Sequence, residues 1–167
     1  MKILVIIDMQ PKFEASKDEK TQAAVVTQIK LAKRHNWPIV VVEFAADQCR
    51  QQFEGWEKGP LLRESPTHFV ILKEVEKYPR FLLVLKDADD GSAKIISARN
   101  KQSWRAIRTF RVMGVNTGAC VKKTAAGLAV KYSVEVYAPG CNAPEWSVND
   151  NPWMREQMPQ NITWEKG

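Results

Sequence analysis

Short runs of consecutive apolar residues recur along the chain and alternate with longer segments that have helical periodicity. Unbroken runs of leucine and β-branched residues are typical of strands covered on both faces, as in parallel sheets. Strands that alternate with helices predict an α/β fold: a three-layer, doubly wound, mostly parallel sheet of about six strands, with helices on both faces. The predicted strands span residues 3–7, 39–44, 81–85, 110–115, 134–137 and 162–164.

The ends of the helices follow from capping and breaking residues. Residues 16–19 have the form of a capping box, so Ser16 is expected to begin the first helix. Ser65 is expected to cap a second helix that ends before Pro79, and Ser92 is expected to cap a third. Pro139 and Gly140 are expected to break the chain after the fifth strand.

One junction carries the strongest chemical signal. The fourth strand runs into a turn that contains Gly114 and Gly118, and a helix is expected to begin at Cys120. Free backbone N–H groups and the helix dipole favour a thiolate in a first helical turn. The sequence therefore predicts a pKa for Cys120 below the usual value of about 8.5.

Two other polar residues end predicted strands. Asp8 ends the first strand and Lys86 ends the third, while Cys120 follows the fourth. Ligands of open parallel sheets bind outside the carboxyl ends of the strands, so these residues are expected at one edge. A carboxylate, an ammonium and a thiol can supply the groups needed for acyl transfer. Taken singly, Asp8 is equally typical of a cap, whereas Lys86 is more typical of a surface lysine and Cys120 slightly more typical of a packing cysteine. Their joint position is what favours the functional interpretation.

Composition limits the domain number, the partners and the location of the protein. A chain of 167 residues suits a single domain over 1–167. The net charge of +6 is spread without runs of like charge, so no nucleic-acid partner is expected. Three cysteines without paired spacing and two histidines give no disulfide framework and favour a reducing, cytoplasmic location. No apolar stretch approaches the roughly 20 residues of a membrane span, so no membrane partner is expected either.

Three motifs resemble one family. They are Leu-Val-Ile-Ile-Asp-Met-Gln at 4–10, the lysine that closes the third strand, and Gly-Val-Asn-Thr-Gly-Ala-Cys-Val-Lys-Lys-Thr-Ala at 114–125. Together they resemble the signature of cysteine hydrolases in the isochorismatase-like superfamily, which includes nicotinamidases. The resemblance extends from residue 3 to about 143. It implies the strand order 3-2-1-4-5-6 and a catalytic triad of Asp8, Lys86 and Cys120.

The resemblance also implies details of the site. It implies a cis peptide between Val115 and Asn116, with the amides of Asn116 and Cys120 forming an oxyanion hole. Phe13 matches a position where the family often places an aromatic ring against the substrate, although loop packing explains it equally well. Trp56, in the polar segment 45–65, could line the same pocket or anchor the loop.

Several positions depart from the family pattern. Nicotinamidases carry an Asp-x-His metal site after the second strand, whereas residues 45–50 contain no histidine. We therefore expect no metal and no cofactor, and an activity other than that of a nicotinamidase proper. Isochorismatases lack the nucleophilic cysteine, which argues against that activity too. Residues 87–91 replace an aromatic residue that many members place after the lysine, so the substrate is left open.

The sequence as a whole predicts a metal-independent cysteine hydrolase. Its expected substrate is a small non-peptide amide or a molecule with a related C–N bond, cleaved through a thioester. The alternative is a catalytically silent protein of the same fold that binds a partner through the tryptophan-rich segment 141–167. Family resemblance further suggests a homo-oligomer.

Overall fold

The six strands form a single sheet. A computed structural model describes residues 1–45, 61, 63–142 and 159–167. The strands lie in the order β3-β2-β1-β4-β5-β6, and every pair is parallel. This confirms the predicted fold and strand order. Their bounds are β1 Ile3–Ile7, β2 Ile39–Phe44, β3 Phe81–Lys86, β4 Thr109–Gly114, β5 Ser133–Cys141 and β6 Ile162–Glu165.

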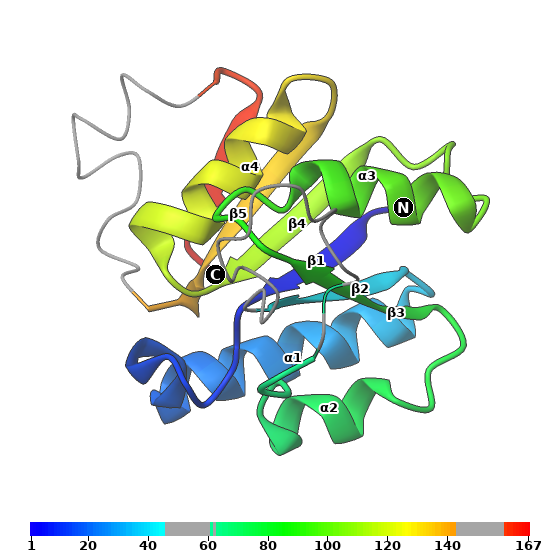
Figure 1. The fold of residues 1–167 in the computed structure, drawn as a ribbon. Coiled ribbons are helices and arrows are strands. Elements are labelled where there is room, and N and C mark those ends of the chain that lie inside the picture. The colour runs from blue at the N-terminus through cyan, green and yellow to red at the C-terminus, as the bar shows by residue number, and fades with distance from the viewer. Residues whose placement is uncertain (46–60, 62, 143–158) are drawn as a thin grey trace, which may run out of the picture.

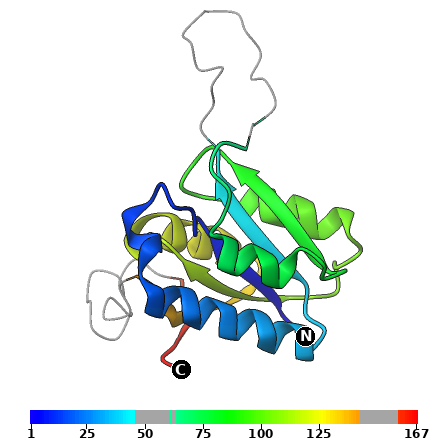
Figure 2. The same ribbon diagram turned by 90° about the horizontal axis from the view of Figure 1, so that it is seen from below.

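Helices cover both faces of this sheet (Figure 1). On one face lie α1 (Glu19–Arg34) and α2 (Phe69–Val75), which pack against each other. On the other lie α3 (Ser92–Lys101) and α4 (Lys122–Ala129). Figure 2 shows the same layers from below. Short helical turns, η1 (Glu14–Lys17) and η2 (Thr117–Val121), follow β1 and β4.

Burial follows the position of each strand in the sheet. All residues of β1 are buried, because β1 lies inside the sheet and has helices on both faces. The prediction that the third strand is equally buried was wrong. β3 is an edge strand of the described sheet, and its Leu83 is 36% exposed.

Three predicted helix caps were also wrong. Asp18 caps α1 instead of Ser16, because its Oδ2 accepts the Thr21 N–H at 2.7 Å. Ser16 lies in η1, where its hydroxyl donates to the Gln10 carbonyl at 2.6 Å. α2 begins four residues beyond Ser65, and Ser92 is the first residue of α3 rather than its cap.

The predicted break at Pro139 and Gly140 does not occur. β5 continues to Cys141, and its register against β4 shifts between Val112 and Gly114. Such a bulge accommodates a residue that lacks an N–H donor. Among the described residues, no helix is long and apolar enough to cross a membrane.

Candidate active site

Asp8 and Lys86 form a buried ion pair at the carboxyl edge of the sheet. Lys86 Nζ lies 2.8 Å from Asp8 Oδ2, and each side chain is only 1% exposed. Asp8 follows β1 with a left-handed φ of +52°, and its N–H donates to the Val42 carbonyl at 2.9 Å. Residues from two strands that are not neighbours in the sheet thus meet at the predicted edge.

The turn after β3 and the end of β2 fix the ammonium of Lys86. Its Nζ donates to the carbonyl oxygens of Ala88 at 3.0 Å and Asp89 at 3.4 Å. It also lies 4.9 Å from the ring centroid of Phe44. Gln10 holds Phe44 in place, because its side chain accepts from Phe44 N at 2.7 Å and donates to Phe44 O at 3.1 Å. Neither Phe44 nor Gln10 was assigned a role in the site from the sequence.

A tight connection carries Cys120 from β4 to α4. Gly114 has a φ of +125°, and a Cβ at this position would overlap the backbone of Ile7. The peptide bond between Val115 and Asn116 is cis, as the family resemblance implied. The η2 turn that follows is held by Asn142, whose Oδ1 accepts from the Thr117 N–H at 2.9 Å. These contacts fix the backbone that leads into the cysteine.

The electrostatics of the thiol differ from the sequence prediction. Cys120 is 7% exposed and lies in η2, before the first residue of α4. Burial and the negative charge of Asp8 raise the pKa of Cys120 to about 12, although Lys86 acts to lower it. The predicted fall in the pKa was therefore wrong. The prediction considered the helix dipole alone, whereas the ionised carboxylate of Asp8, which follows another strand, faces the thiol.

Asp8 is also shifted toward its protonated form. Burial raises the pKa of Asp8 above its usual value and outweighs the Lys86 ammonium, which lowers it. Within the described residues, Asp8 Oδ2 pairs with Lys86 Nζ, whereas Oδ1 has no well-aligned hydrogen-bond donor and can accept one. The carboxylate and the thiol of Cys120 therefore titrate as a coupled pair.

A second carboxylate also contacts the sulfur. The Cys120 thiol donates to Asp89 Oδ1 over 3.7 Å, and Asp89 Oδ2 pairs with Lys123 Nζ at 2.6 Å. Lys123 holds the pKa of Asp89 below its usual value. From the sequence, residues 87–91 were identified only as a departure from the family pattern. No local pattern indicates that Asp89 lies beside a cysteine 31 residues away.

Of the other candidate residues, Phe13 lies beside this cluster rather than in it. The ring of Phe13 packs edge-on against Phe44, with centroids 6.3 Å apart, so Phe13 reaches the lysine through a second aromatic ring. Trp56 lies outside the described residues. In the described part of the chain, no three His, Cys, Asp or Glu side chains are grouped to hold a metal. Most of the segment after β2 lies outside that part, so the absence of a metal stays a prediction.

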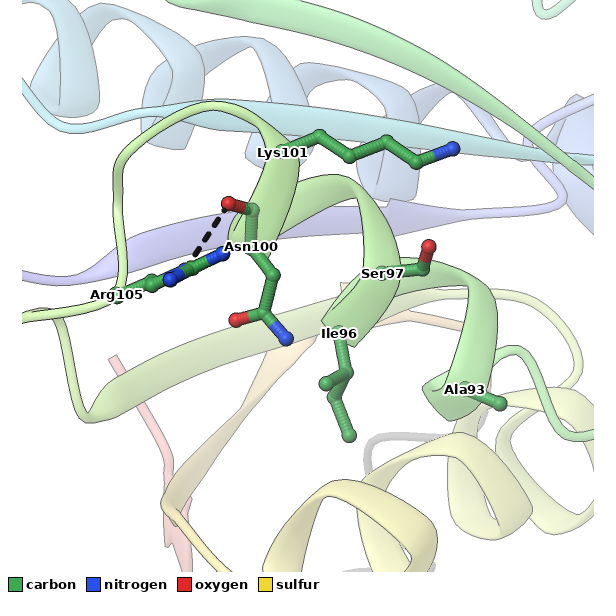
Figure 3. A pocket seen from close by; sticks show the side chains of 6 residues that line it. All are labelled: Ala93, Ile96, Ser97, Asn100, Lys101 and Arg105. Carbon is green, nitrogen blue, oxygen red and sulfur yellow. Dashed lines mark hydrogen bonds between the residues drawn. The ribbon is translucent and has the colours of Figure 1, made fainter.

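A separate hollow of about 520 Å³ lies along α3 (Figure 3). In it, Arg105 Nε donates to the Asn100 carbonyl at 3.3 Å. The lining residues include neither a carboxylate nor a thiol, so the hollow offers none of the chemistry of the strand-end cluster. They are Ala93, Ile96, Ser97, Asn100, Lys101 and Arg105.

Known structures share this fold along almost the whole chain. A pyrazinamidase/nicotinamidase from Streptococcus mutans has a TM-score of 0.73 at 18% identity, covering 99% of this chain and 100% of that one. A nicotinamidase from Staphylococcus aureus has a TM-score of 0.69 at 16% identity, covering 98% of each chain. An N-carbamoylsarcosine amidase from Thermoplasma acidophilum has a TM-score of 0.68 at 19% identity, covering 99% and 96%.

At these identities the structural likeness shows the fold. Comparison with curated protein sequences gives no significant match. A family model described as Isochorismatase domain matches residues 2–139, which is most of the chain. The family model covers most of the sequence, and the sheet has the strand order that the resemblance implied, so the chain belongs to the isochorismatase-like family of hydrolases.

Proposed function

We propose that this protein is a cysteine hydrolase that cleaves a small non-peptide amide or a related C–N bond through a thioester. In this proposal Asp8, Lys86 and Cys120 form the catalytic triad, and no step requires a metal. The observation that carries the proposal is the buried ion pair of Asp8 and Lys86, 2.8 Å apart, beside the thiol of Cys120. Burial of two charges is costly, which makes them a candidate functional site.

The raised pKa values of Asp8 and Cys120 support a proton transfer from the thiol to the carboxylate. Forming a thiolate while Asp8 is ionised would bring a second negative charge into the same buried space, and this opposes ionisation of Cys120. Moving the thiol proton onto Asp8 leaves the total charge of the pair unchanged, and Lys86 balances that charge. Asp8 is suited to receive the proton because burial raises its pKa. The thiolate then forms only as its proton is taken up.

The remaining steps use the turn around the cysteine. The sulfur attacks the carbonyl carbon, and the amides of Asn116 and Cys120 are proposed to stabilise the oxyanion. The turn that contains both amides is closed by the Val121 N–H, which donates to Asn116 O at 3.1 Å. Asp8 then gives its proton to the leaving amine, and water cleaves the thioester. General acid–base catalysis of this kind contributes about 10² to 10⁴-fold.

The choice of an amide rests on the chemistry of the triad and on the names of similar structures. Those proteins are described as nicotinamidases and an N-carbamoylsarcosine amidase, all of which act on a C–N bond by name. The departures noted in the sequence leave the individual substrate open. A homo-oligomeric state and a cytoplasmic location stay predictions from the sequence.

Substitution of the nucleophile tests the proposal. Cys120→Ala should abolish hydrolysis of any small amide that the protein cleaves, while its circular dichroism spectrum and melting temperature stay close to the original. Cys141→Ala is the matched control, because Cys141 is a 1% exposed cysteine of β5 that the mechanism does not use. Full activity in Cys120→Ala would contradict the proposal, because a group other than this thiol would then be the nucleophile.

A further inference from the structure

The sulfur of Cys120 lies between two carboxylates that differ in exposure. Asp8 is 1% exposed and is proposed above as the base. Asp89, whose Oδ1 lies 3.7 Å from Sγ, has a side chain that is 44% exposed. The sulfur thus lies beside one buried carboxylate and one that solvent reaches.

The position of Asp89 is fixed by the same elements that build the triad. Its backbone carbonyl accepts from Lys86 Nζ at 3.4 Å and from the Thr124 hydroxyl at 3.2 Å. The same Thr124 oxygen accepts the Gly91 N–H at 2.9 Å, which ties the turn to α4. Asp89 is therefore not a freely moving surface side chain. It is held against the nucleophile by the catalytic lysine on one side and by the helix that follows Cys120 on the other.

The chemistry of this carboxylate limits what can lie against it. Lys123 Nζ, at 2.6 Å, keeps Asp89 ionised, so the carboxylate can only accept hydrogen bonds. During attack, the carbonyl carbon approaches Sγ to bonding distance, which brings the substituent on that carbon close to Asp89 Oδ1. A substituent with N–H donors or a positive charge gains a charge-assisted hydrogen bond there. An anionic substituent is repelled, and an apolar one leaves the carboxylate unsatisfied.

We propose that Asp89 is a specificity-determining residue, which selects substrates whose acyl substituent carries an N–H donor or a positive charge next to the reacting carbonyl, as in ureido or α-amino amides. The inference rests on the hydrolase function proposed above and names its substrate class. Lys123 supports this role, since it holds Oδ2 of the ionised carboxylate and leaves Oδ1 in contact with the sulfur.

Thiol reagents that differ only in charge test this directly, and they do so without a known substrate. The probes are three methanethiosulfonates of matched size that end in an ammonium, a methyl group or a sulfonate. Labelling of Cys120 is followed by peptide mass spectrometry, which separates it from Cys49 and Cys141. The unaltered protein should react with the cationic reagent at least about tenfold faster than with the anionic one, once intrinsic reagent rates are divided out.

Two variants isolate the carboxylate. Asp89→Asn should reduce this ratio at least about fivefold, because the charge beside the sulfur is lost. Asp90→Asn is the matched control: it makes the same change one residue away, where the side chain accepts the Ser92 N–H at 2.8 Å instead of facing the sulfur. An unchanged ratio in Asp89→Asn, or an equal change in both variants, would overturn the inference.

Activity measurements separate this inference from the proposed function. Asp89→Asn should lower the ratio of kcat/KM for a ureido or α-amino amide to kcat/KM for an alkyl amide of similar size about tenfold or more. Equal losses on both amides would overturn the selection by Asp89 while the hydrolase function stands. If Cys120→Ala retains hydrolysis, the proposed function is wrong. Reagent ratios that still change in Asp89→Asn would then support the position of Asp89 beside the sulfur.

Discussion

Removing the proposed base should make the nucleophile more reactive toward a thiol reagent while destroying catalysis. Asp8→Asn takes away the negative charge that raises the pKa of Cys120, and it leaves Lys86, which lowers it. Burial of the sulfur is unchanged by this nearly isosteric replacement. The pKa of the thiol should therefore fall, and labelling at pH 8 should become faster. Hydrolysis should fall about 10² to 10⁴-fold, because proton transfer to residue 8 is lost.

The size of the acceleration follows from the pKa. At pH 8 a thiol with a pKa of about 12 is ionised in about one molecule in 10⁴. An ordinary thiol, with a pKa of about 8.5, is ionised in about a quarter of the molecules at the same pH. A lower pKa also weakens the nucleophile, so each unit of decrease speeds attack on a disulfide only about threefold. A full return of the pKa from about 12 to 9.0 would speed labelling about thirtyfold, and because burial of the sulfur remains, Asp8→Asn should give a smaller increase than this.

The assay is a time course with a small neutral disulfide reagent, and the product at Cys120 is measured by peptide mass spectrometry. Lys86→Met provides a control of opposite sign. It removes the positive charge that lowers the pKa of Cys120, so labelling should become slower. Circular dichroism of both variants checks that they are folded. The reasoning is refuted if Asp8→Asn labels at the original rate or more slowly, since Asp8 would then not be the group that opposes ionisation of the thiol.

Three further predictions concern the ion pair, the pH dependence and a helix cap. Asp8→Asn and Lys86→Met should each cost about 3 to 5 kcal/mol in urea unfolding, and the double variant clearly less than their sum; additive losses would mean that the charges are not coupled. The pH profile of kcat/KM should rise as Asp8 ionises at its raised pKa and stay level until Cys120 ionises near 12, whereas a fall near 8.5 would contradict the raised thiol pKa. Asp18→Ala should cost about 1 kcal/mol through loss of the α1 cap, seen as a lower melting temperature with unchanged activity; no decrease would contradict the assigned cap.

The parts of the site that follow from backbone topology could be predicted from the sequence. In a parallel sheet every strand ends at the same edge, so residues that close or follow successive apolar runs lie together whatever their side chains. This is why Asp8 and Lys86 could be placed in one cluster although 77 other residues separate them in the chain. The order of the strands came from the family resemblance, since periodicity alone does not specify which strands are neighbours.

The electrostatics could not be predicted in this way. The expected pKa of Cys120 considered only its neighbours in the chain, whereas burial and Asp8 act on it through space. Asp89 was missed for the same reason, because its place beside the sulfur depends on contacts with Lys86 and Thr124. The wrong prediction of the α1 cap has a local cause. Ser16 and Asp18 both suit an N-cap, and the hydroxyl of Ser16 is engaged by the Gln10 carbonyl.

The central claim is that the sulfur of Cys120 becomes covalently bonded to the acyl group of a small amide during turnover. The most direct measurement is to mix the protein with a panel of small amides, quench in acid within the first turnovers, and map any added mass to a peptide. The account predicts an acyl adduct on Cys120 that disappears on longer incubation. Steady hydrolysis with no adduct at any time, together with retained turnover in Cys120→Ala, would contradict it.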